Sequence, residues 1–183
     1  MGANSHDFRN DNNQDHDMSK KKNIAILGFG SHCTDALVSL AGLAGRLIAQ
    51  NGWTLITCGI GGVFEAARKE ALEHQGMVVS LIEQDKTDQV RHYSALLPVS
   101  STSLKRMLAA DISDAGIILG GWTGTLDIAA QMAARGKPVI ALKDTGGAAG
   151  AHGGRYLIPP DGGYIDSAPT IEAAIARMAP LME

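Results

Sequence analysis

The residues of this chain whose types and spacing best suit ligand chemistry lie between Gly116 and Asp127. An apolar run, Gly116–Leu119, leads directly into a glycine and threonine turn that opens a helical pattern. Such a turn points unpaired backbone N–H groups at one spot, at the positive end of the helix dipole, and this favours an anion. Bare glycine backbones and threonine hydroxyls suit the several oxygens of a phosphate. We therefore predict a phosphate-binding turn made by Gly120, Gly121, Thr123, Gly124 and Thr125.

Two further glycine turns follow the first two apolar runs of the chain, at Gly28-Phe-Gly30-Ser31 and Gly59-Ile-Gly61-Gly62. In a parallel sheet with helices on both faces, ligands bind outside the carboxyl ends of the strands. Three turns at that edge predict a phosphorylated, nucleotide-like ligand better than one turn does, because a single GxG sequence is common. Trp122 could stack on a flat heterocycle or pack against another subunit, and His32 could contact the ligand or lie on the surface.

Two common nucleotide-binding motifs are missing from these turns. The first turn continues as Ser31-His-Cys33, so the third glycine of a GxGxxG dinucleotide motif is absent, and no acidic residue ends the second apolar run to hold a ribose. No GxxxxGKS or GxxxxGKT sequence occurs, which removes support for a P-loop hydrolase. The histidines and the two cysteines, Cys33 and Cys58, have no metal-ligand spacing, so we predict no metal site.

Short apolar runs alternate with amphipathic helical patterns from Asn23 onward. The runs are nearly continuous in apolar residues, as a sheet that is covered on both faces requires. This alternation predicts a doubly wound, Rossmann-like α/β fold with a mostly parallel sheet and helices on both faces. The predicted strands are 24–27, 54–58, 77–82, 116–119 and 138–142, and the predicted helices begin near Leu37, Gly62, Ser103, Thr125 and Thr170.

The chain divides into a polar arm and one domain. Residues 1–22 are rich in Asn, Asp, His and Lys, and such a segment cannot bury enough apolar surface to offset the entropy of ordering. We predict that this arm is disordered and that residues 23–183 form a single ligand-binding domain. Between Asp144 and Pro169, where alternation would place another helix, the glycine and proline content predicts a mobile loop.

Composition excludes several partners. The formal net charge of the 183-residue chain is -3, and Lys20-Lys21-Lys22 is its densest basic run, so nucleic acid is not an expected partner. No apolar stretch approaches the roughly 20 residues that cross a bilayer, and the first residues are not a secretory signal. We therefore expect a cytoplasmic protein without a membrane partner.

Two longer motifs resemble a known family. Cys58 to Ala67, followed by Gly76-Met-Val-Val79, resembles the GGGxGVMxAxxxGAxxxGGxVIG stretch of the family that includes LOG-type proteins, once labelled possible lysine decarboxylases, and molybdenum-cofactor carrier proteins. Ser113 to Ile128 resembles its SDAxIxLxGGxGTLxE motif, and Gly136-Lys-Pro-Val-Ile140 resembles GKPVI. The similarity covers about Asn23 to Met178. It implies a Rossmann-like fold and a homo-oligomer, either a dimer or a tetramer.

The chain departs from the LOG-type phosphoribohydrolases, which release a base from a nucleoside 5′-monophosphate. The resemblance places their glutamate, three residues after the motif threonine, at Ile128, while Asp127 comes one residue early. Adjacent helical residues point about 100° apart, so Asp127 cannot simply replace that carboxylate. The hydrolases' RKxxM motif is matched by Lys105-Arg106-Met-Leu-Ala109, which keeps a cation over the cleft. These departures favour a protein without hydrolase activity.

Two features are similar to the carrier branch of the family. The glycine pair and the Gly124-Thr125 pair are separated by one residue more than in the hydrolases, and Leu119 replaces a leading proline. The resemblance implies binding of a pterin phosphate, the molybdenum cofactor, as cargo. We therefore expect a binding protein that holds a phosphorylated heterocycle through the three turns, Lys105 and Arg106. The alternatives are a nucleoside monophosphate phosphoribohydrolase in which Asp127 is an altered catalytic carboxylate, and a ligand-sensing scaffold.

Overall fold

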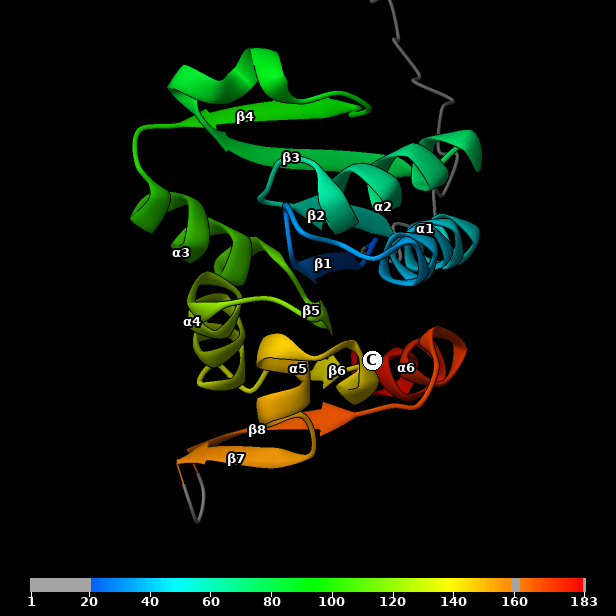
Figure 1. Cartoon of the computed structure of the whole chain (residues 1–183), viewed down its shortest axis with the longest axis vertical. Coiled ribbons are helices and arrows are strands. Elements are labelled where there is room, and N and C mark those ends of the chain that lie inside the picture. Colours follow the sequence, from blue (N-terminus) through cyan, green and yellow to red (C-terminus); the bar gives the residue numbers. More distant parts are fainter. Residues whose placement is uncertain (1–20, 159–161, 183) are drawn as a thin grey trace, which may run out of the picture.

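The computed structural model describes residues 21–158 and 162–182, which form one eight-stranded sheet of order β4-β3-β2-β1-β5-β6-β8-β7. The chain winds outward from the central strand β1 to β4, and then outward on the other side from β5 (Figure 1). Neighbouring strands are parallel, apart from the antiparallel pair of β7 with β8. The strands are β1 (Asn23–Gly28), β2 (Thr54–Thr57), β3 (Met77–Glu83), β4 (Ala95–Val99), β5 (Ala115–Leu119), β6 (Val139–Ala141), β7 (Arg155–Ile158) and β8 (Gly162–Ser167).

Helices cover both faces of this sheet, which confirms the predicted doubly wound α/β fold. One buried apolar cluster joins the sheet to α1, α2 and α6, and a second joins its other face to α3, α4 and α5. In Figure 1 these groups lie to the right and to the left, with α5 in front. The α-helices are α1 (Asp35–Gln50), α2 (Gly62–Glu73), α3 (Thr102–Ile112), α4 (Thr123–Ala133), α5 (Gly147–His152) and α6 (Ile171–Met178), and the 3-10 helices are η1 (Gln84–Gln89), η2 (Lys143–Thr145) and η3 (Ala179–Met182).

The central strand β1 shows why its residues form a buried strand. Ile24 and Ile26 point into the cluster under α1 and α2, whereas Ala25 and Leu27 point into the cluster under α3 and α4. Successive side chains of a strand face opposite sides, so a strand covered on both faces must be apolar at every position. All four of these side chains are at most 1% exposed.

The predicted mobile loop between Asp144 and Pro169 is wrong. The described part of this connection contains α5 and the β7–β8 hairpin, which extends the sheet beyond β6. Its glycines serve as turn residues rather than as flexible links, since Gly146, Gly154 and Gly163 have φ values near +70° that other residues rarely adopt. The edge strand β4 was also missed, because the short run Ala95–Val99 contains Pro98.

The polar arm predicted over residues 1–22 lies outside the described residues except at its end. There, the carbonyl of Lys22 accepts a hydrogen bond from the Thr54 amide at 2.8 Å, and its ammonium group contacts the Met182 carbonyl. Within the described part of the chain, no helix combines the length and apolar character needed to span a membrane.

Candidate ligand-binding site

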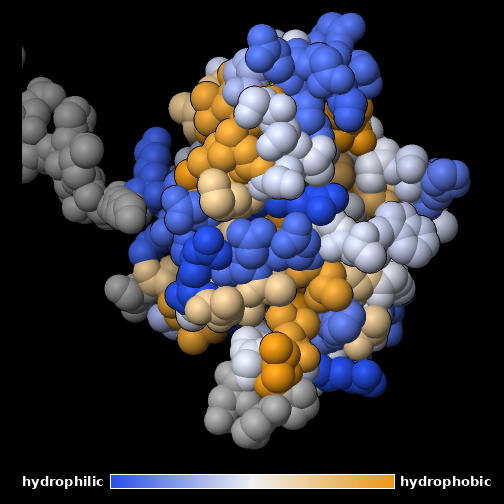
Figure 2. Space-filling model, turned by 90° about the vertical axis from the view of Figure 1, so that its left-hand side faces the viewer, coloured by the Kyte–Doolittle hydropathy of each residue, from blue (hydrophilic) through white to orange (hydrophobic). Residues whose placement is uncertain are grey.

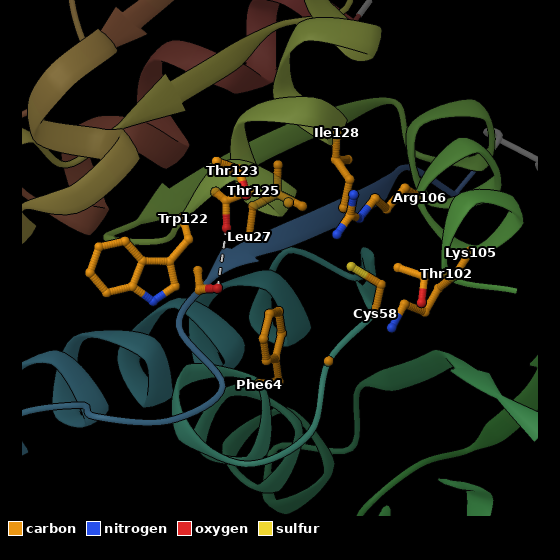
Figure 3. A pocket seen from close by; sticks show the side chains of 13 residues that line it. Leu27, Cys58, Phe64, Thr102, Lys105, Arg106, Trp122, Thr123, Thr125 and Ile128 are labelled. Carbon is orange, nitrogen blue, oxygen red and sulfur yellow. Dashed lines mark hydrogen bonds between the residues drawn. The ribbon is translucent and has the colours of Figure 1, made fainter. Parts of the chain in front are cut away.

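The three glycine turns of the sequence follow β1, β2 and β5, which are adjacent in the sheet, so the turns lie at one edge. A cavity of about 310 Å³ opens between these turns, the N-terminus of α4 and the first turns of α3 (Figure 3). This volume is near the lower limit of typical small-molecule sites. The cavity is lined by Leu27, Gly28, Cys58, Gly59, Phe64, Thr102, Lys105, Arg106, Trp122, Thr123, Gly124, Thr125 and Ile128.

The N-terminus of α4 presents free amide donors to this cavity. Its first backbone hydrogen bond runs from the Leu126 amide to the Trp122 carbonyl, so the amides of Thr123, Gly124 and Thr125 have no acceptor among the described residues. Three other helices, α1, α3 and α6, are capped by threonine or serine side chains, whereas Trp122 gives α4 no such cap. These amides, at the positive end of the helix dipole, can bind an anion.

The N-terminus of α2 differs, because its amides are already used. The Val63 amide donates to the Phe29 carbonyl, and the amides of Phe64 and Glu65 both donate to the Gly61 carbonyl. Gly61 and Gly62 line a separate groove between α1 and α2. In the second predicted turn, Gly59 therefore lines the ligand cavity, whereas Gly61 and Gly62 line the separate groove.

Four other predicted residues also lie outside the cavity lining. A side chain at Gly30 would approach the Ile60 carbonyl oxygen to 2.6 Å, so this glycine permits the first two turns to pack closely. Gly120 donates its amide to the Thr145 hydroxyl at 2.8 Å, and Gly121 has a φ of +89° before the α4 turn. Ser31 is exposed and its hydroxyl lies 3.1 Å from Nδ1 of His32.

Two adjacent cations on α3 reach the cavity, but their charges are balanced differently. Nζ of Lys105 lies 2.7 Å from Oε2 of Glu83, and the Thr102 hydroxyl donates to Oε1 of the same carboxylate at 2.6 Å. Burial alone would raise the pKa of Glu83, but these two hydrogen bonds, together with a backbone hydrogen bond and the charge of Lys105, outweigh it and lower the pKa to about 2. Among the described residues, Arg106 forms an ion pair only with the half-exposed Asp127, at 3.3 Å, so its charge is the more available one.

Trp122 and Phe29 form the aromatic rim of the site. The indole is 67% exposed and its ring centroid lies 4.9 Å from that of Phe29, at an interplanar angle of 65°. Figure 3 shows the indole at one end of the cavity and the cations of α3 at the other. A flat heterocycle could therefore lie against Trp122 while an anionic group meets Arg106 and the α4 amides.

The carboxylate position decides what chemistry the cavity can support. Ile128 lines it, as the helical geometry of the sequence predicts, whereas Asp127 lies outside the lining with 42% of its side chain exposed. Asp127 accepts hydrogen bonds from Arg106 and from Gln131, at 3.3 and 3.0 Å. Among the described residues, those that line the cavity include no carboxylate.

Cys58 faces the cavity beneath the two cations, at the end of β2 (Figure 3). Burial raises the pKa of its thiol to about 11, although Lys105 and Arg106 act in the opposite direction. The thiol is therefore protonated at neutral pH and contributes a small, weakly polar surface to the wall.

Sequence reasoning missed the residues that fix this wall from behind. Arg68, which is fully buried, donates to the carbonyl of Gly59 at 2.8 Å, to the carbonyl of Arg91 at 3.0 Å and to Glu65 at 2.6 Å. A buried arginine requires such partners, so its place in the apolar pattern of α2 was the available signal. Thr102 could also have been found, because it precedes Arg106 by one helical turn. Among residues 21–158 and 162–182, no three His, Cys, Asp or Glu side chains gather as a metal-binding group.

The chain is similar to known proteins in both sequence and structure. Residues 21–155 match the sequence model of the SLOG cluster4 family. An uncharacterized protein of Archaeoglobus fulgidus is 32% identical over 125 residues, which cover 68% of this chain and 82% of that protein. The molybdenum cofactor binding protein of Rippkaea orientalis is similar in structure, with a TM-score of 0.78 at 22% identity over 90% of this chain and 99% of the other. For the molybdenum cofactor carrier protein of Chlamydomonas reinhardtii, the TM-score is 0.75 at 25% identity over 88% and 99%.

Proposed function

We propose that this chain, which belongs to the SLOG cluster4 family, is a binding protein for a phosphorylated flat heterocycle. The cargo we infer is a pterin phosphate of the molybdenum-cofactor type, or a similar nucleotide-like compound, and the protein holds it without hydrolysing it. The observation that carries the proposal is the meeting of three acceptor-free amides of α4, the Arg106 guanidinium and an exposed indole around one cavity.

The phosphate end of the ligand would lie at the N-terminus of α4. There, the amides of Thr123, Gly124 and Thr125 donate hydrogen bonds, and Arg106 adds a charge-assisted contact from α3. Gly124 makes this approach possible, because a Cβ at that position would come within 2.9 Å of the Arg106 guanidinium. In this proposal, phosphate recognition depends on Arg106 of α3 and Gly124 of α4, which are consecutive helices of the chain.

The ring end of the ligand would lie along Trp122 and the apolar part of the wall. Leu27, Phe64 and Ile128 supply this surface, and the Thr102 hydroxyl and the Cys58 thiol supply polar edges. A pterin, which is flat and carries several hydrogen-bonding atoms, fits such a mixed wall. The likeness in structure to two proteins named for molybdenum cofactor binding supports this choice of cargo.

The composition of the cavity wall supports carriage without hydrolysis. A phosphoribohydrolase needs a carboxylate beside the sugar carbon that loses the base, and at the position where the resemblance implies that carboxylate this chain has Ile128, which lines the cavity. Asp127 would have to leave Arg106 and Gln131 and turn about 100° around the helix to enter. We infer that binding, not turnover, is the task of this site.

The direct test is native mass spectrometry of the protein as purified from cells, followed by identification of the small molecule it releases. We expect a pterin phosphate, or a nucleotide-like monophosphate, at one per chain. A second assay incubates the protein with AMP and measures free adenine. Adenine release that is lost in Asp127→Ala would overturn the proposal in favour of a hydrolase, and failure of any phosphorylated compound to raise the melting temperature would refute binding itself.

A further inference from the structure

A second pocket adjoins the candidate ligand cavity at the carboxyl edge of the sheet. It has a volume of about 310 Å³ and lies between the turn after β1, the start of α1 and the segment after β6. Phe29 lines this pocket and Trp122 lines the cavity, and the centroids of the two rings are 4.9 Å apart. The two spaces therefore meet at one aromatic pair, at the end of the cavity that lies away from the cations of α3 (Figure 3).

The walls of the two spaces carry opposite charge. The cavity is lined by Lys105 and Arg106, and its described lining residues include no carboxylate. The second pocket is lined by Asp144, and no lysine or arginine stands among the described residues around it. A phosphate is attracted by the first wall and repelled by the second, so the second pocket suits an uncharged part of a ligand.

The polar side chains of the second pocket still have free hydrogen-bonding capacity. Among residues 21–158 and 162–182, the carboxylate of Asp144 makes no hydrogen bond or ion pair. His32 uses Nδ1, which lies 3.1 Å from the Ser31 hydroxyl, and its Nε2 has no partner in the same part of the chain. The apolar side chains of the lining are Phe29, Ala36, Leu37 and Leu40. Such a pocket fits a flat ring whose faces are apolar and whose edge donates hydrogen bonds.

We propose that the ring of the bound ligand extends across the Trp122–Phe29 pair, and that Asp144 accepts hydrogen bonds from its outer edge and so selects an aminopyrimidinone ring. This inference rests on the proposed function, in which α4 and Arg106 hold the phosphate. An aminopyrimidinone carries a ring N–H beside an exocyclic amino group, and the two oxygens of a carboxylate accept from both. Guanine and the pterins share this edge. Adenine has an acceptor nitrogen beside its amino group, and hypoxanthine has no amino group, so both pair less well with Asp144.

Neighbouring groups of the protein follow the order of the groups in such a ligand. Trp122 directly precedes the free amides of α4, its indole contacts Phe29, and Phe29 lines the pocket of Asp144. A phosphate, a flat ring and a pair of N–H donors therefore meet amides, aromatic side chains and a carboxylate in that sequence.

The segment that carries Asp144 is fixed to the ligand turn. The next residue, Thr145, accepts a hydrogen bond from the Gly120 amide at 2.8 Å. A Cβ at Gly147 would lie 2.8 Å from the Phe29 ring, so the backbone after Asp144 also packs closely on the aromatic pair. These contacts hold the carboxylate beside the ligand turn, as a side chain that determines specificity requires.

A third hollow offers the ring another direction past Trp122. It has a volume of about 230 Å³ and lies towards α5. Its described lining residues are mostly apolar or glycine and include no carboxylate, with His152 as the ionisable side chain. The paired N–H donors of an aminopyrimidinone would find no charged acceptor there, so the pocket of Asp144 is the better match.

The β7–β8 hairpin is a further surface on which a flat ring could stack. Figure 2, which faces the α3–α4 side, shows hydrophobic surface near this hairpin below a hydrophilic band. Tyr156 and Tyr164 are exposed there, with ring centroids 5.1 Å apart. The carboxylate of the described hairpin residues, Asp166, is already paired with Arg177 at 3.3 Å. This surface therefore lacks the free acceptor that the second pocket has.

The first experiment compares ligands on the wild-type chain by titration calorimetry. GMP and IMP differ only in the amino group that Asp144 is expected to bind, so GMP should bind about fivefold to tenfold more tightly than IMP. Hydroxymethylpterin phosphate should show a similar advantage over IMP. The tighter of GMP and the pterin phosphate identifies the source of the ring. Equal affinities for GMP, the pterin phosphate and IMP would overturn the proposal.

The second experiment assigns this preference to its residue. Asp144→Asn places an amide N–H₂ opposite the donors of the ring, so the variant should bind GMP and IMP with affinities within about twofold of each other. Its affinity for ribose 5-phosphate and its melting temperature should stay at the wild-type values, since Asp144 is exposed and lies outside the cavity. Asp85→Asn, which is also exposed, and His152→Ala should keep the preference. Loss of the preference in His152→Ala but not in Asp144→Asn would place the ring in the third hollow and overturn the proposal.

Ribose 5-phosphate separates this inference from the proposed function. It carries the phosphate but no ring, so its binding reports on α4 and Arg106 alone. If it binds while wild type does not distinguish GMP from IMP, the phosphate site stands and the role of Asp144 is wrong. If neither ribose 5-phosphate nor any nucleotide binds, the proposed function fails and this inference fails with it.

Discussion

At the scale of single residues, Lys105 and Arg106 differ in how much of their charge is available to a ligand. Both are on α3 and both line the cavity, yet Glu83 neutralises one of them at 2.7 Å. The effective positive charge of the wall therefore comes from Arg106 and the α4 dipole. One weakly paired cation beside a helix N-terminus suits the single phosphate group of the ligand that we propose.

The first prediction concerns Arg106. Arg106→Ala should weaken binding of a phosphorylated ligand by about 10-fold to 100-fold, because a charge-assisted hydrogen bond contributes roughly 1.5–3 kcal/mol. Its effect on the free energy of unfolding should be within about 0.5 kcal/mol, since the side chain is partly exposed. Titration calorimetry measures the first quantity and urea denaturation the second. Arg135→Ala, just beyond the C-terminal end of α4 and outside the cavity, is the control, and equal losses in both variants would contradict this role.

The second prediction concerns the pH dependence that Glu83 causes. Its pKa falls from 4.5 to about 2 on folding, so the carboxylate stabilises the folded state above the unfolded pKa and loses this effect as pH falls through the folded value. Glu83→Gln should therefore cost about 1–3 kcal/mol of unfolding free energy at neutral pH, and progressively less in acid.

Urea denaturation of wild type and Glu83→Gln at several pH values checks this dependence. The control is Asp85→Asn, an exposed substitution on the next segment, which should shift stability by less than about 0.5 kcal/mol at every pH. A stability difference between wild type and Glu83→Gln that stays constant down to about pH 2 would count against the ion pair with Lys105. The same variant should bind the phosphorylated ligand more tightly, because it frees the Lys105 charge.

At the scale of elements, the contact between α1 and α2 depends on glycine. Gly45 lies where a Cβ would overlap the backbone of Ala67, whereas Gly42, one helical turn earlier, faces the flexible end of Glu70. Both helices pack on β1 and β2, so they lie side by side on one face of the sheet. Their position in turn fixes the Gly61–Gly62 turn, where α2 begins beside the ligand edge.

The third prediction compares these two glycines. Gly45→Ala should destabilise the protein by about 1–3 kcal/mol or more, because a rigid backbone has to move. Gly42→Ala should be nearly neutral, since the Glu70 side chain can shift and alanine favours the helix by roughly 0.5–1 kcal/mol. Thermal and urea denaturation of both variants test the difference. If the two variants had the same free energy of unfolding, the close approach of α1 to α2 at Gly45 would be contradicted.

At the scale of the whole molecule, the sheet is strongest at its centre and weakest at the β7 edge. β1 lies between β2 and β5 with both faces buried, whereas β7 pairs only with β8 and its residues are partly or fully exposed. Local opening follows such differences in burial and pairing. The candidate site lies at the carboxyl ends of β1, β2 and β5, which are adjacent strands in the middle of the sheet.

The fourth prediction follows from this gradient. Amide hydrogens of β1 and β5 should exchange only through global unfolding, whereas those of the β7–β8 hairpin should exchange at least about 100-fold faster through local opening. Hydrogen exchange followed by mass spectrometry measures both in one experiment. Uniform exchange across the sheet would be inconsistent with the predicted gradient.

The sequence by itself determined the doubly wound fold, the family and the three turns, because these depend on local patterns. Continuous apolar runs specify strands buried on both faces, and a glycine turn between a strand and a helix needs no distant partner to be recognised. The place of Ile128 and Asp127 was equally local, since helical periodicity alone sets their directions.

The tertiary structure decided which of these residues meet. Only the folded chain shows that Glu83 forms an ion pair with Lys105 and that Arg68 donates a hydrogen bond to the Gly59 carbonyl. It also shows that the amides of residues 63–65 in α2 have acceptors, whereas those of residues 123–125 in α4 have none among the described residues. It also turned a predicted loop into α5 and a hairpin, because glycines at positive φ make tight turns as readily as flexible links. Long-range pairing depends on the spatial neighbours that folding selects, and no local pattern in the sequence records them.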